Sequence, residues 1–107
     1  MGIDLELRVR QGAARRDGVV RRSHRHGDSL ALALETLVPA GQGRLSRIDP
    51  CRDTRFTEQD AQAALREVTA LVDKCTSPFQ EAALLDLAEF LEACARTPGS
   101  SLWFLGD

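Results

Sequence analysis

Three cysteines, Cys51, Cys75 and Cys94, are the side chains of this sequence best suited to metal or covalent chemistry. Thiolates are common zinc ligands, but structural zinc sites usually contain a Cys-x-x-Cys pair, which the sequence lacks. Cys75 and Cys94 recur with apolar residues at helical spacing, so we interpret them as core-filling residues. We expect reduced thiols. If any two cysteines lie close together, we expect them to be Cys51 and Cys94.

The stretch 23–29 combines two histidines with an aspartate in the order His24-x-His26-x-Asp28. This spacing resembles the metal-binding motif of metallo-β-lactamase-like hydrolases, in which a further histidine follows; here Ser29 takes that place. The family's metal site also needs more histidines than the two in this chain. We therefore interpret the stretch as an exposed polar loop in which Asp28 or Ser29 caps a helix.

Two carboxylates, Asp49 and Asp53, flank Cys51 in the stretch 49–54. Acid catalysis by such a pair would need a third group and a pocket, and the sequence indicates neither. An Asp-Pro pair is typical of a turn, and Asp53 can hydrogen-bond the backbone before a helix. There is also no glycine-rich phosphate loop. We therefore predict a non-enzymatic protein with no catalytic residues, no cofactor and no metal site.

Arginines are concentrated in the first quarter of the chain, and five of them form our candidate partner-binding set. These residues are Arg15, Arg16, Arg21, Arg22 and Arg25. The stretch 56–96 is acidic, so the net charge of −2 conceals an opposed distribution of charge. The two regions either neutralise each other within the fold or present a basic face to an acidic partner.

The same arginines could bind nucleic-acid phosphates. However, the chain has no tyrosine and a net negative charge, and base-stacking side chains are missing from the basic region. We therefore expect binding to another protein, as in an immunity-type, antitoxin-type or regulatory accessory protein. Association with nucleic acid through residues 15–25 is the alternative. A metal- or thiol-responsive protein that uses Cys51, Cys94 and the loop of His24 and His26 is the second alternative.

The length of 107 residues suits a single globular domain that spans the whole chain (1–107) and buries one modest core. No apolar run approaches the ~20 residues that a membrane-spanning helix needs, so we expect no membrane association. The first residues alternate apolar and charged side chains, unlike a secretory signal peptide. We therefore expect a cytoplasmic location.

The stretch 56–96 carries the strongest secondary-structure signals. Thr57 is a suitable helix N-cap, and Asp60 occupies the position from which a capping-box side chain reaches back to it. Apolar residues then recur at steps of three and four from Ala61 to Cys75, which is the spacing of one helical face.

A second helix start follows almost immediately. Ser77 is the N-cap, Pro78 suits the first helical position, and Gln80 completes a Ser-x-x-Gln box. The apolar stripe that begins at Phe79 is wider than that of the preceding helix, so we expect burial on two sides. The short link predicts an antiparallel helical hairpin, which Pro98 and the following glycine end.

The two ends of the chain are predicted strands. Residues 3–10 alternate apolar and charged side chains without a fault, which indicates a strand with one covered face. Residues 101–105 are apolar on both faces, which predicts either an inner strand or a strand that lies under a loop, and we expect it to pair with the first strand. Asp17-Gly18 is typical of a two-residue turn, and residues 19–23 form a short return strand.

Residues 30–38 predict a third helix, because leucine and alanine favour helices and Pro39 stops the pattern. The stretch 40–56 is a long connection that Leu45 and Ile48 attach to the core. The predicted fold class is therefore α+β: a helical hairpin plus a third short helix, packed on a small sheet formed by the N-terminal and C-terminal strands.

Overall fold

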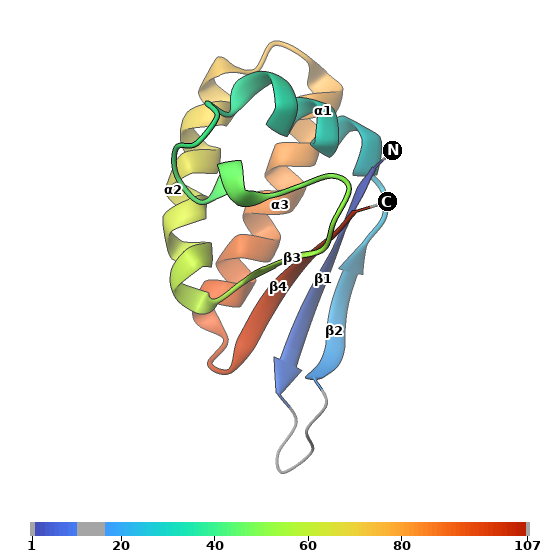
Figure 1. Cartoon of the computed structure of the whole chain (residues 1–107), viewed down its shortest axis with the longest axis vertical. Coiled ribbons are helices and arrows are strands. Elements are labelled where there is room, and N and C mark those ends of the chain that lie inside the picture. Colours follow the sequence, from blue (N-terminus) through green and yellow to red (C-terminus); the bar gives the residue numbers. More distant parts are fainter. Residues whose placement is uncertain (1, 11–16, 107) are drawn as a thin grey trace.

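The structure is a computed structural model that describes residues 2–10 and 17–106 (Figure 1). Within these residues, strands begin and end the chain, and the three helices lie between them. In chain order the elements are β1 (Ile3–Arg10), β2 (Asp17–Ser23), α1 (Gly27–Leu37), the 3₁₀ turn η1 (Leu45–Arg47), β3 (Thr54–Phe56), α2 (Glu58–Lys74), α3 (Pro78–Arg96) and β4 (Ser100–Gly106).

The strands form one antiparallel sheet in the order β2-β1-β4-β3. The two central strands are the first and the last of the chain, with Ile3 opposite Gly106 and Val9 opposite Ser100. This register confirms the predicted pairing of the N-terminal and C-terminal segments. The α+β class and the helical hairpin are confirmed as well (Figure 1).

One face of the sheet is covered by the helices (Figure 1). On β1 this face carries Ile3, Leu5 and Leu7, which are at most 4% exposed. Leu5 lies opposite Phe104 on β4, and the Phe104 ring packs edge-on against Phe56 of β3, with ring centroids 4.7 Å apart. Because side chains alternate along a strand, the charged residues between these positions point to the opposite face.

The helical hairpin has the predicted caps. Thr57 and Asp60 form a complete capping box at the start of α2, and the Ser77 hydroxyl accepts a hydrogen bond from the Gln80 N–H at the start of α3. In keeping with its wider apolar stripe, α3 buries more side chains than α2. The fully buried set of α3 is Ala83, Leu84, Leu87, Phe90, Leu91 and Cys94, against Ala61, Ala64, Val68 and Leu71 on α2.

Phe79 is an exception to the predicted stripe of α3, because its side chain is 75% exposed. It lies in the first turn of α3, at the end of the molecule where α2 turns into α3 (Figure 1). An apolar residue at the correct spacing is buried only if another element reaches that turn of the helix.

No helix of the described residues combines the length and the apolar character needed to cross a membrane.

The predicted turn at Asp17-Gly18 is wrong. Both residues belong to β2, where Asp17 lies opposite Arg10 and Gly18 opposite Val9. Residues 11–16 lie outside the described part of the chain. The pairing also shifts by one residue between Leu7 and Arg8, and such a bulge cannot be recognised from an Asp-Gly pair.

The predicted helix at residues 30–38 is confirmed, but its predicted cap is wrong. The N-cap of α1 is His26, whose side chain makes no capping hydrogen bond, and Asp28 lies inside the first turn. There its negative charge favours the positive end of the helix without acting as a cap. Gly27 opens the helix close to β1: a Cβ atom on it would lie 3.3 Å from the Asp4 carboxylate.

The connection 40–56 has structure of its own. Leu45 and Ile48 are buried in the core, as predicted, with 2% and 9% exposure. The strand β3 was not predicted, because three residues are too few to show a period of two. It adds the fourth strand to the sheet and turns Arg55 toward the face that the helices leave uncovered.

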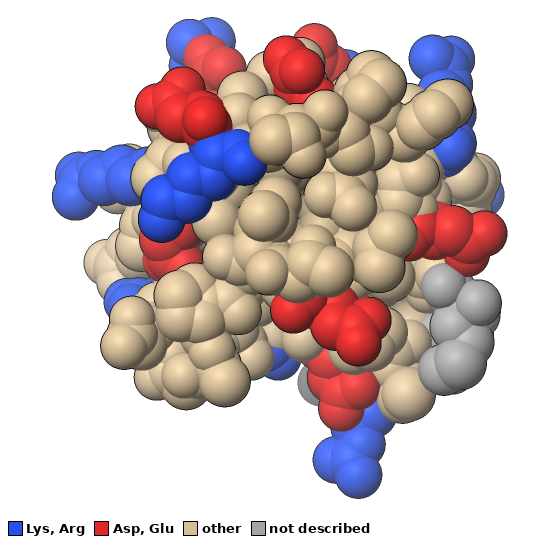
Figure 2. All heavy atoms as spheres, turned by 90° about the horizontal axis from the view of Figure 1, so that it is seen from above, with Lys and Arg blue, Asp and Glu red and all other residues tan. Residues whose placement is uncertain are grey.

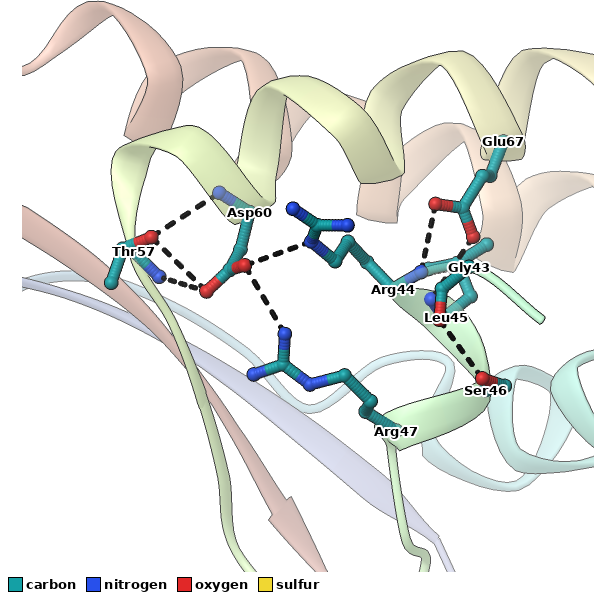
Figure 3. A network of polar contacts seen from close by, with 8 residues as sticks. All are labelled: Gly43, Arg44, Leu45, Ser46, Arg47, Thr57, Asp60 and Glu67. Carbon is teal, nitrogen blue, oxygen red and sulfur yellow. Dashed lines mark hydrogen bonds and ion pairs between the residues drawn. The ribbon is translucent and has the colours of Figure 1, made fainter. Parts of the chain in front are cut away.

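Two carboxylates of α2 hold the start of this connection, and we call the arrangement the α2 clamp (Figure 3). Asp60 accepts hydrogen bonds from Arg44 Nε at 3.0 Å and from Arg47 Nη1 at 3.2 Å. Glu67 accepts the backbone N–H groups of Arg44 at 2.9 Å and Leu45 at 3.0 Å. The clamp thus pairs its carboxylates with donors from η1 and the residue before it.

The charge of Asp60 is favoured by this surrounding. Burial on its own raises the pKa of the carboxyl group, but hydrogen bonds from Thr57 and Arg44 and the charge of Arg47 outweigh it, so the pKa falls to about 2. Asp60 therefore stays ionised well below neutral pH. The charged groups of the clamp have a structural role, since they hold the connection 40–56 against α2.

Candidate functional site

Of the five arginines predicted to bind a partner, the three that the structure describes do not share one surface. Arg15 and Arg16 lie outside the described residues. Arg21 and Arg22 are neighbours on β2 and point to opposite faces of the sheet. Arg25 is exposed in the loop before α1. Among Arg21, Arg22 and Arg25, Arg22 alone belongs to the face that the helices leave uncovered.

Arg21 points toward the helices. Its Nη2 atom lies 3.3 Å from Glu89 Oε2 on α3, and its guanidinium carbon lies 4.9 Å from the centre of the Phe90 ring. The neighbouring Ser23 hydroxyl donates to Asp86 of the same helix. The basic first quarter of the chain and the acidic stretch 56–96 therefore do make ionic contact within the fold. In the described part of the chain, this contact is confined to the side chains between β2 and α3.

A row of four side chains crosses the uncovered face of the sheet, one from each strand. The register places Arg22 of β2 opposite Glu6 of β1, Glu6 opposite Trp103 of β4, and Trp103 opposite Arg55 of β3. We call this set the sheet-face row. It brings together residues from the start, the middle and the end of the sequence.

The centre of the row is fixed by contacts with Arg8, which follows Glu6 on the same face. Arg8 donates from Nε at 3.1 Å and from Nη2 at 2.8 Å to Glu6 Oε1. Its guanidinium carbon stacks 4.4 Å from the centre of a Trp103 ring. The Trp103 Nε1–H donates to the Ser101 hydroxyl at 3.1 Å. A guanidinium held at both its edge and its face has little freedom to move.

The two ends of the row are cationic and open to solvent. Arg22 Nε lies 3.4 Å from Glu6 Oε2, yet its side chain is 59% exposed, whereas that of Glu6 is 11% exposed. Arg55 is also exposed, and no ion pair or hydrogen bond of its side chain is present among the described residues. The uncovered face therefore combines a preorganised aromatic centre with accessible cations on either side.

No family model, no curated protein and no solved structure matches this chain.

Sequence reasoning missed Arg8, Trp103 and Arg55 as members of a candidate site. The alternation of residues 3–10 predicts that Glu6 and Arg8 face away from the core. The position of Trp103 follows from the same alternation once β4 is paired with β1. Arg55 had no such signal, because its orientation depends on β3.

The cysteines show no sign of acting together. All three are free; Cys51 is exposed and Cys94 is buried. Burial raises the pKa of the Cys94 thiol, which disfavours the reactive thiolate. Cys51 and Cys94, the pair that we expected if any two cysteines lay close together, are near opposite ends of β4. Cys94 contacts Ser100 at the start of β4, whereas the residues on both sides of Cys51 pack on Gly106 at its end.

The two histidines line a polar cavity of about 370 Å³ beside the start of α1. His24 Nδ1 lies 3.0 Å from Asp4 Oδ2 across the ends of β2 and β1. Among the residues that the structure describes, no group of three or more histidine, cysteine, aspartate or glutamate side chains is arranged to hold a metal ion. The metal- or thiol-responsive alternative therefore finds no assembled site there.

Two further cavities, of about 330 and 300 Å³, lie on either side of the link between α1 and η1. Val38, Pro39 and Leu45 line both of them. Seen from the end formed by α1 and the α2–α3 turn, the molecule has a mostly uncharged centre with charged side chains around its rim (Figure 2). Most residues that line these cavities are apolar, and neither lining contains a histidine or a cysteine, so the cavities do not indicate a reaction centre.

Proposed function

We propose that this chain is a non-enzymatic binding protein that docks another protein on the uncovered face of its sheet. The observation that carries the proposal is the stack of Arg8 on Trp103, held by Glu6 and flanked by the exposed Arg22 and Arg55. Tryptophan and arginine are the residues that most often dominate the binding energy of protein interfaces. Side chains that are already fixed lose little entropy on binding.

A protein partner suits this face better than a nucleic acid. Glu6 and Asp4 lie on the same face as the arginines, and their negative charges would repel a phosphate backbone. The face also offers a single aromatic ring, whereas surfaces for single-stranded nucleic acid usually stack several bases. Mixed charges around an aromatic centre are instead common at protein interfaces.

The biological role that we propose follows from size and surface together. A small domain that binds one partner through a charged face fits an immunity-type, antitoxin-type or regulatory accessory protein of the cytoplasm. In each of these roles the binding event is itself the function, and no reaction centre is required. The partner is then a protein with an acidic docking surface.

A photo-crosslinking residue placed on the sheet tests the proposal. Leu105 lies opposite Asp4 on the uncovered face, and Leu85 of α3, which is 49% exposed, offers a matched position on the helical side. We expect benzoylphenylalanine at position 105, but not at position 85, to give one discrete protein adduct in the cells of origin. The adduct should disappear when Trp103→Ala is added. Equal adducts from both positions, or an adduct with nucleic acid, would contradict the proposal.

A further inference from the structure

We infer that the partner presents to the sheet-face row a segment with two carboxylates about 14 Å apart and an apolar side chain between them. This inference rests on the proposed function and specifies the chemistry of the partner. It follows from the spacing of the two exposed arginines, from their incomplete pairing and from the character of the surface that separates them.

The spacing comes from the sheet. Arg22 and Arg55 are the outer members of the row, on β2 and β3, with β1 and β4 between them. Neighbouring strands are about 4.8 Å apart, so three steps separate the two positions by roughly 14 Å. One carboxylate cannot serve both arginines over that distance.

The pairing of each arginine is incomplete. Arg22 contacts Glu6 through Nε alone, at 3.4 Å, and the Arg55 side chain forms no ion pair or hydrogen bond with another described residue. A guanidinium offers five N–H donors in a planar fork that suits two parallel hydrogen bonds to a carboxylate. Both ends of the row can therefore take an external carboxylate without displacing a contact that the fold depends on.

An acidic side chain of the partner would not be favoured at the middle of the row. Glu6 already accepts from Arg8 and contacts Arg22, so its own charge would repel another carboxylate there. Beside it lies the half-buried indole of Trp103, with the Arg8 guanidinium stacked on it. An apolar side chain of the partner would gain by covering the indole and the stem of Arg8.

An extended segment meets these requirements together. Side chains at alternate positions of an extended chain point the same way, and residues four apart are separated by about 13 Å. An acidic residue, an apolar residue two positions later and a second acidic residue after two more therefore match the row. The segment would cross the four strands, as strands do in orthogonal sheet packing.

Nuclear magnetic resonance titration with two synthetic peptides tests the inference. One peptide carries glutamates at its second and sixth positions and leucine at its fourth; the other has the same composition with the glutamates adjacent. Trp103 is the single tryptophan of the chain, so its indole N–H gives one unambiguous signal on the surface in question. We expect the spaced peptide to shift this signal saturably and the other peptide to bind roughly tenfold more weakly.

Matched neutral variants identify the arginines involved. Arg22→Gln and Arg55→Gln should each weaken binding of the spaced peptide by about tenfold, because each removes a charge-assisted contact. Arg66→Gln, which removes the same charge from an exposed position on α2, should leave the affinity unchanged. Thermal melts of the three variants establish that they are folded.

Three outcomes would overturn the inference: equal binding of the two peptides, no shift of the indole signal with either, or tighter binding of an oligothymidylate at the same residues. The last result would favour nucleic acid as the ligand. If position 105 still gives a protein adduct while the peptides fail, the inference is wrong and the proposed function stands. If that adduct is also absent, both are wrong.

Discussion

The α2 clamp and the sheet-face row are built from the same kinds of side chain and use them in different ways. In the clamp, Arg44 and Arg47 converge on Asp60, while Glu67 accepts two backbone N–H groups. In the row, Glu6 contacts Arg8 and Arg22, but the Arg55 side chain forms no ion pair or hydrogen bond within the described part of the chain. The carboxylates of the clamp bind donors from another segment and so stabilise the fold. The exposed arginines of the row remain available to bind a partner.

This comparison predicts that changes in the clamp alter stability and changes at the ends of the row alter binding. The largest effect is expected for Asp60→Ala. This substitution removes the capping box of α2 and leaves Arg44 and Arg47 without their carboxylate. We expect the free energy of unfolding to fall by about 2–3 kcal/mol. Urea denaturation measures the change, and a loss no larger than that of Arg66→Ala would refute the structural role of the clamp.

A pair of glycines in the same loop sharpens the test. Gly43 and Gly41 both have a positive φ, of 75° and 76°. A Cβ on Gly43 would lie 2.4 Å from Glu67 Oε1, whereas a Cβ on Gly41 would meet nothing within 4 Å.

Gly41→Ala should cost about 1 kcal/mol of stability through backbone strain alone. Gly43→Ala should cost about 1–2 kcal/mol more, because the methyl group displaces the Glu67 carboxylate from its two N–H donors. Thermal melts of the two variants compare them directly. Equal losses would mean that Glu67 contributes little to holding the loop.

The low pKa of Asp60 should make the stability of the fold depend on pH in the acid range. The pKa of Asp60 is held at about 2, below its usual 3.8, so its ionisation stabilises the folded state at any pH above about 4. That contribution is lost as the pH falls from about 4 toward 2. Asp60→Asn should therefore flatten the dependence of stability on pH in this window. An unchanged slope in urea titrations at stepped pH would show that other carboxyl groups account for the acid sensitivity.

The smallest effect on stability is expected at the ends of the row. Arg22→Gln and Arg55→Gln remove exposed side chains, so each should change the free energy of unfolding by less than about 0.5 kcal/mol. Urea denaturation of the two variants beside the wild-type chain is the measurement. A loss comparable to that of Asp60→Ala would mean that these arginines support the fold, which would remove the distinction between the two regions.

Local patterns in the sequence were sufficient for most of the fold. The alternation of residues 3–10 and the caps at Thr57 and Ser77 each depend on neighbours within a few positions, and they predicted β1 and the hairpin. The strand β3 and the bulge in β2 had no such local signal. Their positions depend on pairing with strands far away in the sequence, which no window of a few residues contains.

The candidate site was predicted only in part for the same reason. A cluster of arginines in the sequence drew attention to residues 15–25, but consecutive residues of a strand face opposite ways, so Arg21 and Arg22 separate. Arg55 and Trp103 are 48 positions apart and meet only through the register of β3 with β4. The spacing of residues in the sequence predicted most of the helices and strands, whereas the pairing of strands brings the residues of the sheet-face row together.

The central claim is that the uncovered face of the sheet, rather than the helical side, is the binding surface. Its most direct test is the affinity of the crosslinked partner for two variants that each remove one aromatic side chain. Trp103→Ala alters the sheet-face row, and Phe79→Ala alters a ring that is 75% exposed at the other end of α3 from the start of β4. We predict that Trp103→Ala weakens binding at least tenfold while Phe79→Ala leaves it unchanged. Equal losses, or a loss with Phe79→Ala alone, would contradict the claim.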